Sequence, residues 1–474
     1  MSDDSLHYQT IETLAPRLQS GELSPVTLTE NLLARIDALN PQLNAFRLVT
    51  AERALAAAQA AELQIKAGQY LGPLHGIPYV TKDLFDVAGL PTTAGSKTRE
   101  QTFADTDSTV TRKLAQSGMV LLGKTNTVEF AFGSVGINHS HGTPHNPWQQ
   151  THHNPGGSSS GSAVAVATGM APFGTGSDTA CSVRTPAALC GIVGLKTTVG
   201  RISRKGVYPL SHTLDSIGPL TRSVHDAALL CQVLQGADAA DPATLNHAPI
   251  DVLRSLRAGV RGLRVAFAET AFFDELDPEV EQAVRACGQV FSDLGAQVSA
   301  IDYPEAAQSL AIPLSLSMVE GMAYNRVALD QHFEQLDPIV GKRLQLGRNI
   351  SAPDYAAALL EMHRLRASQR ATLRDVDVIL APTCMQPALP VSIIDADMDR
   401  YMHYARVYMR NCLIGNLLDL CAVSIPCGLT KQGLPIGLMI YAKPFQEAMT
   451  LRAAYAYEQA TTHSAQHPPL DWLQ

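Results

Sequence analysis

One region rich in glycine, serine and alanine, residues 156–184, constrains this chain more than any other. It begins with a Gly/Ser-rich loop over 156–162, continues with a helix of very small residues over 163–169, and reaches a second Gly/Ser/Asp segment over 176–184. Several serines and many backbone N–H groups are thereby placed in tight turns near a helix N-terminus. Such turns can supply a nucleophile and a pocket for an oxyanion, so the region predicts a site for nucleophilic chemistry.

The composition is that of a folded protein of enzyme size. The chain has 474 residues, 46% hydrophobic and 17% charged, enough for one large α/β unit or for two to three domains. The net charge of −8, without a run of Lys or Arg, argues against nucleic-acid and anionic-membrane partners. No window approaches the roughly 18 apolar residues of a membrane span. We therefore expect a soluble cytoplasmic protein with eight free, buried cysteines.

Hydrophobic periodicity predicts helices first and an alternation of strands and helices later. Residues 1–70 are expected to be helical, with one alanine-rich helix over 51–67. Apolar runs between turn residues predict strands at 119–122, 263–267, 376–380, 422–425 and 438–441. An amphipathic helix is expected after Asp277-Pro278, and residues 305–375 are expected to form a helical cap. This alternation indicates an α/β sheet with helices on both faces.

A serine nucleophile needs a base, and the histidines offer no Ser-His-Asp set by spacing. A lysine stands at the end of the run Gly76-Ile77-Pro78-Tyr79-Val80-Thr81-Lys82-Asp83. The segment 157–161 formally matches the GxSxG elbow, which would make Ser159 the nucleophile, but that elbow needs a strand directly before it, and Thr151–Pro155 is not one. A Walker-type phosphate loop is absent, and no serine stands three residues before a lysine.

Together these segments resemble the amidase signature family of serine hydrolases. The resemblance covers nearly the whole chain, is densest from 73 to 226, and also includes the segments 94–96, 123–126, 129–131, 146–148, 191–196 and 215–220. It implies the amidase signature fold, a large central mixed and twisted β-sheet covered by helices on both faces. It also implies that residues 1–474 form a single amidase domain: N-terminal helices (1–70), a catalytic core with the signature (71–260), and a C-terminal part (261–474) that completes the sheet and carries the cap.

The resemblance assigns a Ser-Ser-Lys relay in place of a histidine. The lysine of the family's GIPxxxKD pattern falls on Lys82, the bridging serine in an unusual cis peptide on Ser158, and the nucleophile on Ser182. Lys82 must be neutral to act as a base, so its pKa has to fall from about 10.4 toward roughly 7–8. The expected oxyanion donors are the backbone N–H groups of Thr179, Ala180, Cys181 and Ser182, and Asp178 is expected to orient this turn.

The same resemblance suggests where substrate is bound. In the family the loop at Phe132-Gly133-Ser134 borders the substrate cleft, so Gly133, Ser134 and His139 or His141 are expected to contact substrate. Arg343 could match an arginine that, with an aspartate, holds glutamine in the A subunit of the glutamyl/aspartyl-tRNA amidotransferase. The segment 408–413, where the aspartate should fall, has no acid. Arg343 is alternatively expected to bind a substrate carboxylate.

Two features near the signature allow other chemistry. Five histidines crowd one loop, at positions 139, 141, 145, 152 and 153, but they match no zinc-ligand pattern such as HExxH, so we expect no metal. Many relatives have two glycines before the nucleophile, where this chain has Ala180-Cys181. This exchange keeps the N–H donors and narrows the pocket. It also puts a thiol beside the chemistry, which makes Cys181 an alternative nucleophile.

We therefore predict an amidohydrolase that cleaves a linear carboxamide or ureido C–N bond through a serine acyl-enzyme and releases ammonia or an amine. No cofactor is expected, and the expected partner is a small-molecule amide, with neither nucleic acid nor membrane. Because dimers are common among relatives, a homodimer is possible. The alternatives are the A subunit of the amidotransferase, which would act as a glutaminase, and a noncatalytic scaffold of the same fold.

Overall fold

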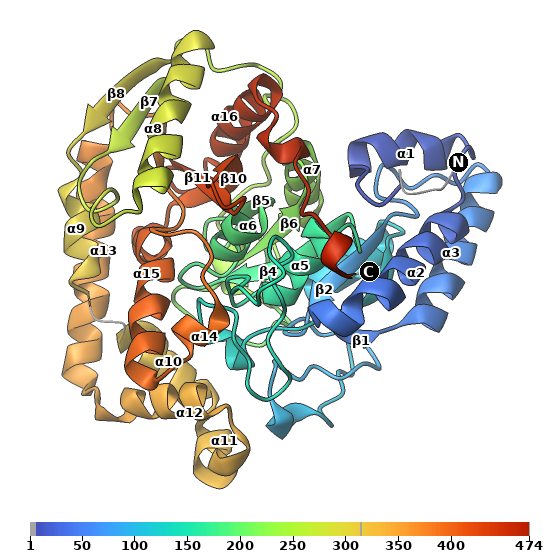
Figure 1. Cartoon of the computed structure of the whole chain (residues 1–474), viewed down its shortest axis with the longest axis horizontal. Coiled ribbons are helices and arrows are strands. Elements are labelled where there is room, and N and C mark those ends of the chain that lie inside the picture. The colour runs from blue at the N-terminus through green and yellow to red at the C-terminus, as the bar shows by residue number, and fades with distance from the viewer. Residues whose placement is uncertain (1–5, 313–314, 474) are drawn as a thin grey trace.

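The protein is built around one large mixed β-sheet. The structure is a computed structural model that describes residues 6–312 and 315–473. In these residues eleven strands form a sheet in the order β1-β3-β2-β4-β6-β5-β10-β11-β9-β7-β8, which runs across the molecule in Figure 1. This arrangement confirms the predicted α/β fold class.

The strands and helices have the following bounds. The strands are β1 Phe46–Val49, β2 Pro78–Lys82, β3 Val120–Thr125, β4 Phe173–Asp178, β5 Val193–Lys196, β6 Ser216–Thr221, β7 Arg264–Ala268, β8 Gln297–Ile301, β9 Val378–Pro382, β10 Cys421–Leu429 and β11 Pro435–Ala442. The helices are α1 Ile11–Gln19, α2 Pro25–Leu43, α3 Ala51–Lys66, α4 Thr109–Gln116, α5 Ser160–Ala167, α6 Arg184–Cys190, α7 Val224–Leu234, α8 Pro278–Asp293, α9 Pro304–Leu310, α10 Ser315–Tyr324, α11 Arg326–Gln331, α12 Pro338–Gln345, α13 Ala352–Thr372, α14 Val391–Ile394, α15 Met398–Leu417 and α16 Glu447–Ala460.

Strand direction differs between the middle of the sheet and its flanks. From β4 through β6, β5, β10 and β11 to β9 every neighbouring pair is antiparallel. On one flank β3, β2 and β4 are parallel, and on the other β9, β7 and β8 are parallel. Parallel strands are normally buried on both faces. Lys82 ends β2 within the first parallel group and Asp178 ends β4, so the predicted site residues gather at one edge of this group.

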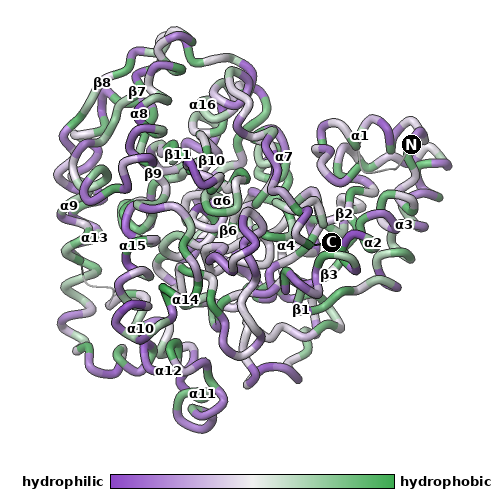
Figure 2. The backbone as a smooth tube through the Cα atoms, viewed as in Figure 1, coloured by the Kyte–Doolittle hydropathy of each residue, from purple (hydrophilic) through white to green (hydrophobic). Residues whose placement is uncertain are grey.

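Helices cover both faces of the sheet, as alternate side chains of one strand demonstrate. Val265 and Phe267 of β7 pack in an apolar cluster with α7, α8 and α16. Their neighbours Ala266 and Ala268 pack in a second cluster with α9, α13 and α15. Because successive strand side chains point to opposite faces, these clusters lie on opposite sides of the sheet. Figure 2 shows hydrophobic and hydrophilic residues alternating along outer helices such as α13, as expected for helices with one buried face.

Most predicted elements are confirmed, and one region differs. The alanine-rich helix is α3, the helix after Asp277 is α8, and residues 305–375 are mainly helical, from α9 to α13, with 313–314 outside the described residues. Residues 1–70, predicted to be helical, also contain β1, which pairs antiparallel with β3 at the sheet edge. Its four residues are too few to give a strand pattern of their own. The chain's C-terminal end returns to this region (Figure 1), where Gln42 Nε2 donates to the Leu473 carbonyl at 2.9 Å.

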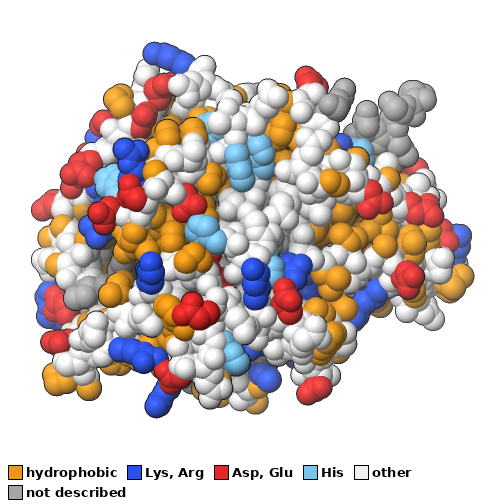
Figure 3. All heavy atoms as spheres, turned by 60° about the horizontal axis from the view of Figure 1, so that its bottom comes forward, with side chains coloured by type: hydrophobic (Ala, Val, Ile, Leu, Met, Phe, Trp, Pro, Cys, Tyr) orange, Lys and Arg blue, Asp and Glu red, His pale blue; other side chains and the backbone are white. Residues whose placement is uncertain are grey.

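The surface carries charges of both signs. Figure 3 shows acidic and basic side chains interspersed over the face that it presents, with hydrophobic side chains between them. Among residues 6–312 and 315–473, no helix is long and apolar enough to cross a bilayer.

Candidate functional site

Lys82 is a fully buried lysine whose amine meets only hydroxyl groups among the described residues. Its Nζ donates to Ser158 Oγ at 2.7 Å and to Ser177 Oγ at 3.0 Å, and its backbone N–H donates to Thr175 Oγ1. The side chain is 0% exposed. Burial lowers the pKa of Lys82 to about 7, although the Asp178 and Asp215 carboxylates favour its charged form. A large fraction of this amine is therefore neutral near pH 7.

Ser158 lies in a tight loop before α5 that only glycines can build. The Gly157–Ser158 peptide bond is cis, as the resemblance implies. Gly157 N–H donates to the Ser134 carbonyl at 2.7 Å, and a Cβ on Gly157 would lie 2.7 Å from the Gly136 nitrogen. Gly156 has φ +74°, in the left-handed region that glycine adopts readily. The two glycines thus hold Ser158 Oγ against Lys82.

Ser182 lies in the turn between β4 and α6, next to the Ser158 loop. The Ser159 N–H donates to the Ser182 carbonyl at 3.3 Å, which ties the turn to the loop. Within residues 6–312 and 315–473, the backbone N–H groups of Thr179, Ala180, Cys181 and Ser182 donate to no protein acceptor. Successive free N–H groups in a turn form a concave site that attracts negative charge.

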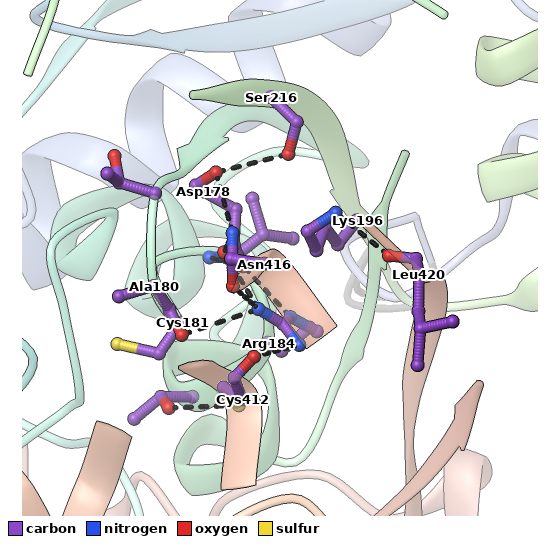
Figure 4. Close-up of polar contacts among 12 residues, drawn as sticks. Asp178, Ala180, Cys181, Arg184, Lys196, Ser216, Cys412, Asn416 and Leu420 are labelled. Carbon is purple, nitrogen blue, oxygen red and sulfur yellow. Dashed lines mark hydrogen bonds and ion pairs between the residues drawn. The ribbon is translucent and has the colours of Figure 1, made fainter. Parts of the chain in front are cut away.

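A buried ion pair fixes the shape of this turn. The Arg184 guanidinium forms two hydrogen bonds with the Asp178 carboxylate, at 2.9 and 3.0 Å, and both side chains are fully buried. The Val183 N–H also donates to Asp178, while Asn416 from α15 contacts both charged groups. Figure 4 shows Arg184 enclosed by Asp178, Asn416 and Cys412. These interactions hold the pKa of Asp178 low, at about 2. Asp178 therefore orients the turn, as predicted from the sequence.

A narrow pocket opens beside Ser182, which we call the serine pocket. It has a volume of about 30 Å³ and is lined by Ala131, Phe132, Gly133, Ser134, Thr179, Ala180, Cys181, Ser182, Leu210, Ser317, Arg343 and Met409. Gly133, Ser134 and Arg343, three of the predicted substrate contacts, thus lie around the same space as Ser182 and the free N–H groups.

Arg343 is a buried cation without an acidic partner in the described parts of the chain. Its guanidinium donates to the Phe132 carbonyl at 2.7 Å and stacks over the Phe132 ring, with 4.3 Å from Cζ to the ring centre. Its Nε has no acceptor. Buried charges are normally paired, so this arrangement leaves Arg343 able to bind an anionic group in the pocket.

His139 lies apart from the lining of the serine pocket. Its Nδ1 is 2.8 Å from Asp337 Oδ2 and its Nε2 is 2.9 Å from Asp395 Oδ2. Hydrogen bonding to Asp337, with support from Asp395, raises the pKa of His139 to about 9. Asp337 caps the N-terminus of α12, the helix that carries Arg343. Both ring nitrogens of His139 are thus engaged with protein carboxylates.

Three other histidines of this loop bind backbone carbonyls, whereas His141 Nδ1 lies 3.9 Å from a Glu100 carboxylate oxygen. His145 Nε2 contacts Gln149 O, His152 Nε2 contacts Pro144 O, and His153 Nδ1 contacts Thr151 O. Burial lowers the pKa of His145 and of His152. The described residues contain no group of three or more His, Cys, Asp or Glu side chains able to hold a metal ion.

The two alternative nucleophiles are poorly placed for attack. Cys181 is 1% exposed, and burial raises the pKa of its thiol far above the ordinary value, so the reactive thiolate is not formed. Ser159 is fully buried and its Oγ lies 3.5 Å from the Ser177 carbonyl. Neither side chain has a base of the kind that Lys82 offers to Ser158.

Sequence reasoning missed Ser177 and Asn416. Ser177 supplies the second hydroxyl on Lys82, and Asn416 bridges Asp178 and Arg184 from a segment more than 200 residues away. The Gly-Ser-Asp triplet at 176–178 was a sequence signal for Ser177, which β4 places beside Lys82 because β4 is the neighbour of β2 in the sheet. No local signal pointed to Asn416.

This arrangement can support acyl transfer. A partly neutral lysine can accept a proton through a serine hydroxyl, and free N–H groups can stabilise an oxyanion nearby.

The comparisons with known proteins identify the family of the chain. The sequence matches the amidase family over residues 27–451. It is 38% identical to the A subunit of a glutamyl-tRNA(Gln) amidotransferase from Alkalilimnicola ehrlichii, over 98% of this chain and 99% of that protein. It is 37% identical to an amidase from Pseudomonas putida, with the same coverage. Among solved structures, peptide amidase from Stenotrophomonas maltophilia superimposes with a TM-score of 0.84 at 30% identity, covering 98% of this chain and 99% of that one.

Proposed function

Because the chain belongs to the amidase family, we propose that it hydrolyses a linear carboxamide or ureido C–N bond through an acyl-enzyme on Ser182. Ser182 Oγ attacks the carbonyl carbon, and its proton passes through Ser158 to Lys82. The C–N bond then breaks as the nitrogen takes a proton from the same relay. Water releases the acyl group by the same steps, and Ser182 is regenerated.

The observation that carries this proposal is the contact between Lys82 and Ser158. A fully buried lysine, 2.7 Å from a serine hydroxyl and with a pKa near 7, is matched to proton transfer at neutral pH. Its hydroxyl partners distinguish Lys82 from Lys124, which pairs with the Asp83 carboxylate, and from Lys196, which donates to two backbone carbonyls. The free N–H groups of residues 179–182 would stabilise the tetrahedral oxyanion, where loss of one donor typically reduces the rate by about 10²- to 10³-fold.

Arg343 supports a substrate with an anionic group. It is buried, lines the serine pocket and has an unpartnered Nε. An arginine fork binds a carboxylate through two parallel hydrogen bonds. In our proposal the acyl part of the substrate is compact and carries a carboxylate or a comparable anion, because the pocket is narrow.

A second candidate is a glutaminase that works within an amidotransferase. The similarity to the A subunit of such an enzyme supports it, and Arg343 would then hold the glutamine carboxylate. However, segment 408–413 offers no acid for the amino group, and its Asn411 amide is already bonded to the carbonyls of Phe272 and Pro382. We therefore place the general amidase first and a noncatalytic scaffold last, since Lys82, Ser158 and Ser182 are all present.

The test is ammonia or amine release from a panel of amides by the purified protein. The panel includes glutamine, ureido compounds, and neutral and carboxylate-bearing amides, and Ser182→Ala is the control. We expect release from a carboxylate-bearing amide that disappears in Ser182→Ala. Release from glutamine alone would favour the amidotransferase role. Release that survives Ser182→Ala, or no release by folded protein, would contradict the proposal.

A further inference from the structure

A second pocket adjoins the serine pocket and contacts the lysine relay. It has a volume of about 300 Å³ and shares Ala131, Thr179 and Leu210 with the serine pocket as a common wall. Ser177, whose hydroxyl accepts a hydrogen bond from Lys82 Nζ, also lines it. The two pockets therefore meet at the turn that carries Ser182, and only the second is lined by Ser177, one of the two hydroxyl partners of Lys82.

The lining of the second pocket combines apolar side chains with charged side chains of both signs. Asp215 lies in its wall and accepts hydrogen bonds from Thr179 Oγ1 and from the Leu210 N–H, while Arg204 and Asp241 form an ion pair at 3.1 Å. Tyr324 lines the pocket as well and is 45% exposed. Since paired charges and phenol groups favour polar guests without selecting one sign of charge, this pocket suits small polar molecules.

The mouth of the pocket opens to solvent. Ala240 and Pro242 are exposed residues of its lining, whereas the neighbouring Ala239 is exposed but does not line it. A molecule can thus reach the Ser177 side of the site without crossing the narrow serine pocket. A separate route to solvent lets the amine product leave a buried site while the acyl group is still bound to the serine.

We propose that this second pocket is the amine subsite, through which the leaving ammonia or small polar amine departs and an incoming amine reaches the acyl-enzyme. The inference rests on the proposed function. The leaving nitrogen takes its proton from the relay of Ser158 and Lys82, so it has to lie on the side of the scissile bond that faces them. Ser177 places the second pocket on that side.

The subsite implies acyl transfer to small amines. A nucleophilic nitrogen entering there forms a C–N bond to the acyl carbon while the C–O bond to Ser182 breaks. The proton of the amine passes through the relay to Ser182 Oγ. No oxidant, reductant or metal is required. With hydroxylamine as the amine, the product is a hydroxamate and free enzyme is restored.

The experiment measures how an acyl-enzyme is shared between water and amines. p-Nitrophenyl acetate acylates the serine, and the ratio of acetohydroxamate to acetate is measured at fixed hydroxylamine concentration. Each acyl-enzyme reacts either with the amine or with water, and the product ratio reports this partition. The ratio therefore does not depend on how quickly a variant is acylated. The measurement is repeated with ethanolamine, a larger polar amine.

Two variants at the mouth have opposite expected effects. Ala240→Trp narrows the mouth, so we expect the amide-to-acetate ratio to fall about tenfold with ethanolamine and less with hydroxylamine. Tyr324→Ala widens it, so the ratio with ethanolamine should rise. Ala239→Trp is the matched control and should leave both ratios at the wild-type value.

Each outcome bears on one proposal. Equal ratios in wild type, Ala240→Trp and Tyr324→Ala would overturn the amine subsite, because the amine would then enter elsewhere. A change of the same size in Ala239→Trp would overturn it as well. If p-nitrophenol release persists in Ser182→Ala, or no acyl-enzyme forms in the wild type, the proposed function itself fails.

Discussion

Two fully buried lysines on adjacent strands, Lys82 and Lys124, meet different partners. The strands β2 and β3 pair in parallel, with Thr81 opposite Lys124 and Lys82 opposite Thr125. Lys124 Nζ lies 2.6 Å from the Asp83 carboxylate and also donates to the Pro91 carbonyl. Lys82 Nζ donates only to hydroxyl groups among the described residues. One buried charge is thus compensated by an acid and the other is not.

In the proposed function, this difference separates a lysine that stabilises the fold from a lysine that accepts a proton. Burial lowers the pKa of both amines, but at Lys124 the adjacent Asp83 carboxylate opposes the change. For Lys82 the charged form remains unfavourable enough to bring the pKa to about 7. A shift of one pKa unit corresponds to about 1.4 kcal/mol, so Lys82 lowers the stability of the fold by several kcal/mol at neutral pH.

The first prediction is that Lys82→Met removes activity without weakening the fold. Loss of the base should reduce kcat/KM by about 10²- to 10⁴-fold. The folded pKa of Lys82 lies below its unfolded value, so the native state loses stability as pH falls from about 10.5 toward 7. A methionine side chain carries no charge whose burial would cost stability, and its volume is similar to that of the lysine side chain. The urea midpoint of unfolding at pH 7 should therefore stay equal or rise, and a large fall would contradict the comparison.

The second prediction is that Lys124→Met has the opposite outcome. It leaves the Asp83 carboxylate buried without its cation, which should lower the free energy of unfolding by about 3–5 kcal/mol. The same urea experiment measures it. The double variant Lys124→Met with Asp83→Leu removes both charges and should recover most of the loss. Equal midpoints for Lys82→Met and Lys124→Met would show that the two lysines do not differ in this way.

The sequence predicted the parts of this site that belong to local patterns. Local composition predicted only turns rich in serines and free N–H groups, while Lys82, Ser158 and Ser182 were assigned from the resemblance to the amidase signature family. The sheet class was accessible because β3, β7, β9, β10 and β11 contain apolar runs, whereas β4 and β6, which contain glycine, serine and threonine, were not predicted as strands. The strand β1 was not, because its four residues gain their strand conformation from pairing with β3.

The contacts that the sequence did not predict are those set by register and by distant segments. Asp83 and Lys124 are 41 residues apart, and only the pairing of β2 with β3 brings them together. The carboxylate partners of His139, Asp337 and Asp395, are 198 and 256 residues away in the sequence. The sequence therefore predicted a substrate contact for His139 and gave no sign of these two ion pairs. Whether a buried cation is paired decides its chemistry, and pairing is a property of the tertiary structure.

The third prediction concerns the pH dependence of hydrolysis. Lys82 has to be neutral to accept a proton, so kcat/KM should fall about tenfold per pH unit below an apparent pKa near 7. Ser177→Ala removes one hydroxyl that accepts a hydrogen bond from the ammonium form. This change disfavours the charged amine, so the acid limb should move to lower pH. Thr175→Val, which alters a backbone contact of Lys82 instead, is the control. If the acid limb of the kcat/KM profile lies at the same pH in Ser177→Ala and in the wild type, the assignment of this limb to Lys82 is contradicted.

The fourth prediction is that His139, like Lys124, stabilises the fold because its charged side chain is paired with carboxylates. Its folded pKa, about 9, lies above the unfolded value of about 6.5, so it stabilises the fold fully below pH 6.5, and the contribution is lost as pH rises through 9. Because its side chain is 29% exposed, solvent screening reduces the effect to about 1 kcal/mol. His139→Gln should therefore lower the free energy of unfolding by about that amount at pH 6 and by little at pH 10. His212→Gln, on an exposed histidine, is the matched control. An equal loss at both pH values would mean that His139 acts through packing rather than through its charge, and that pairing with Asp337 and Asp395 contributes no net stability.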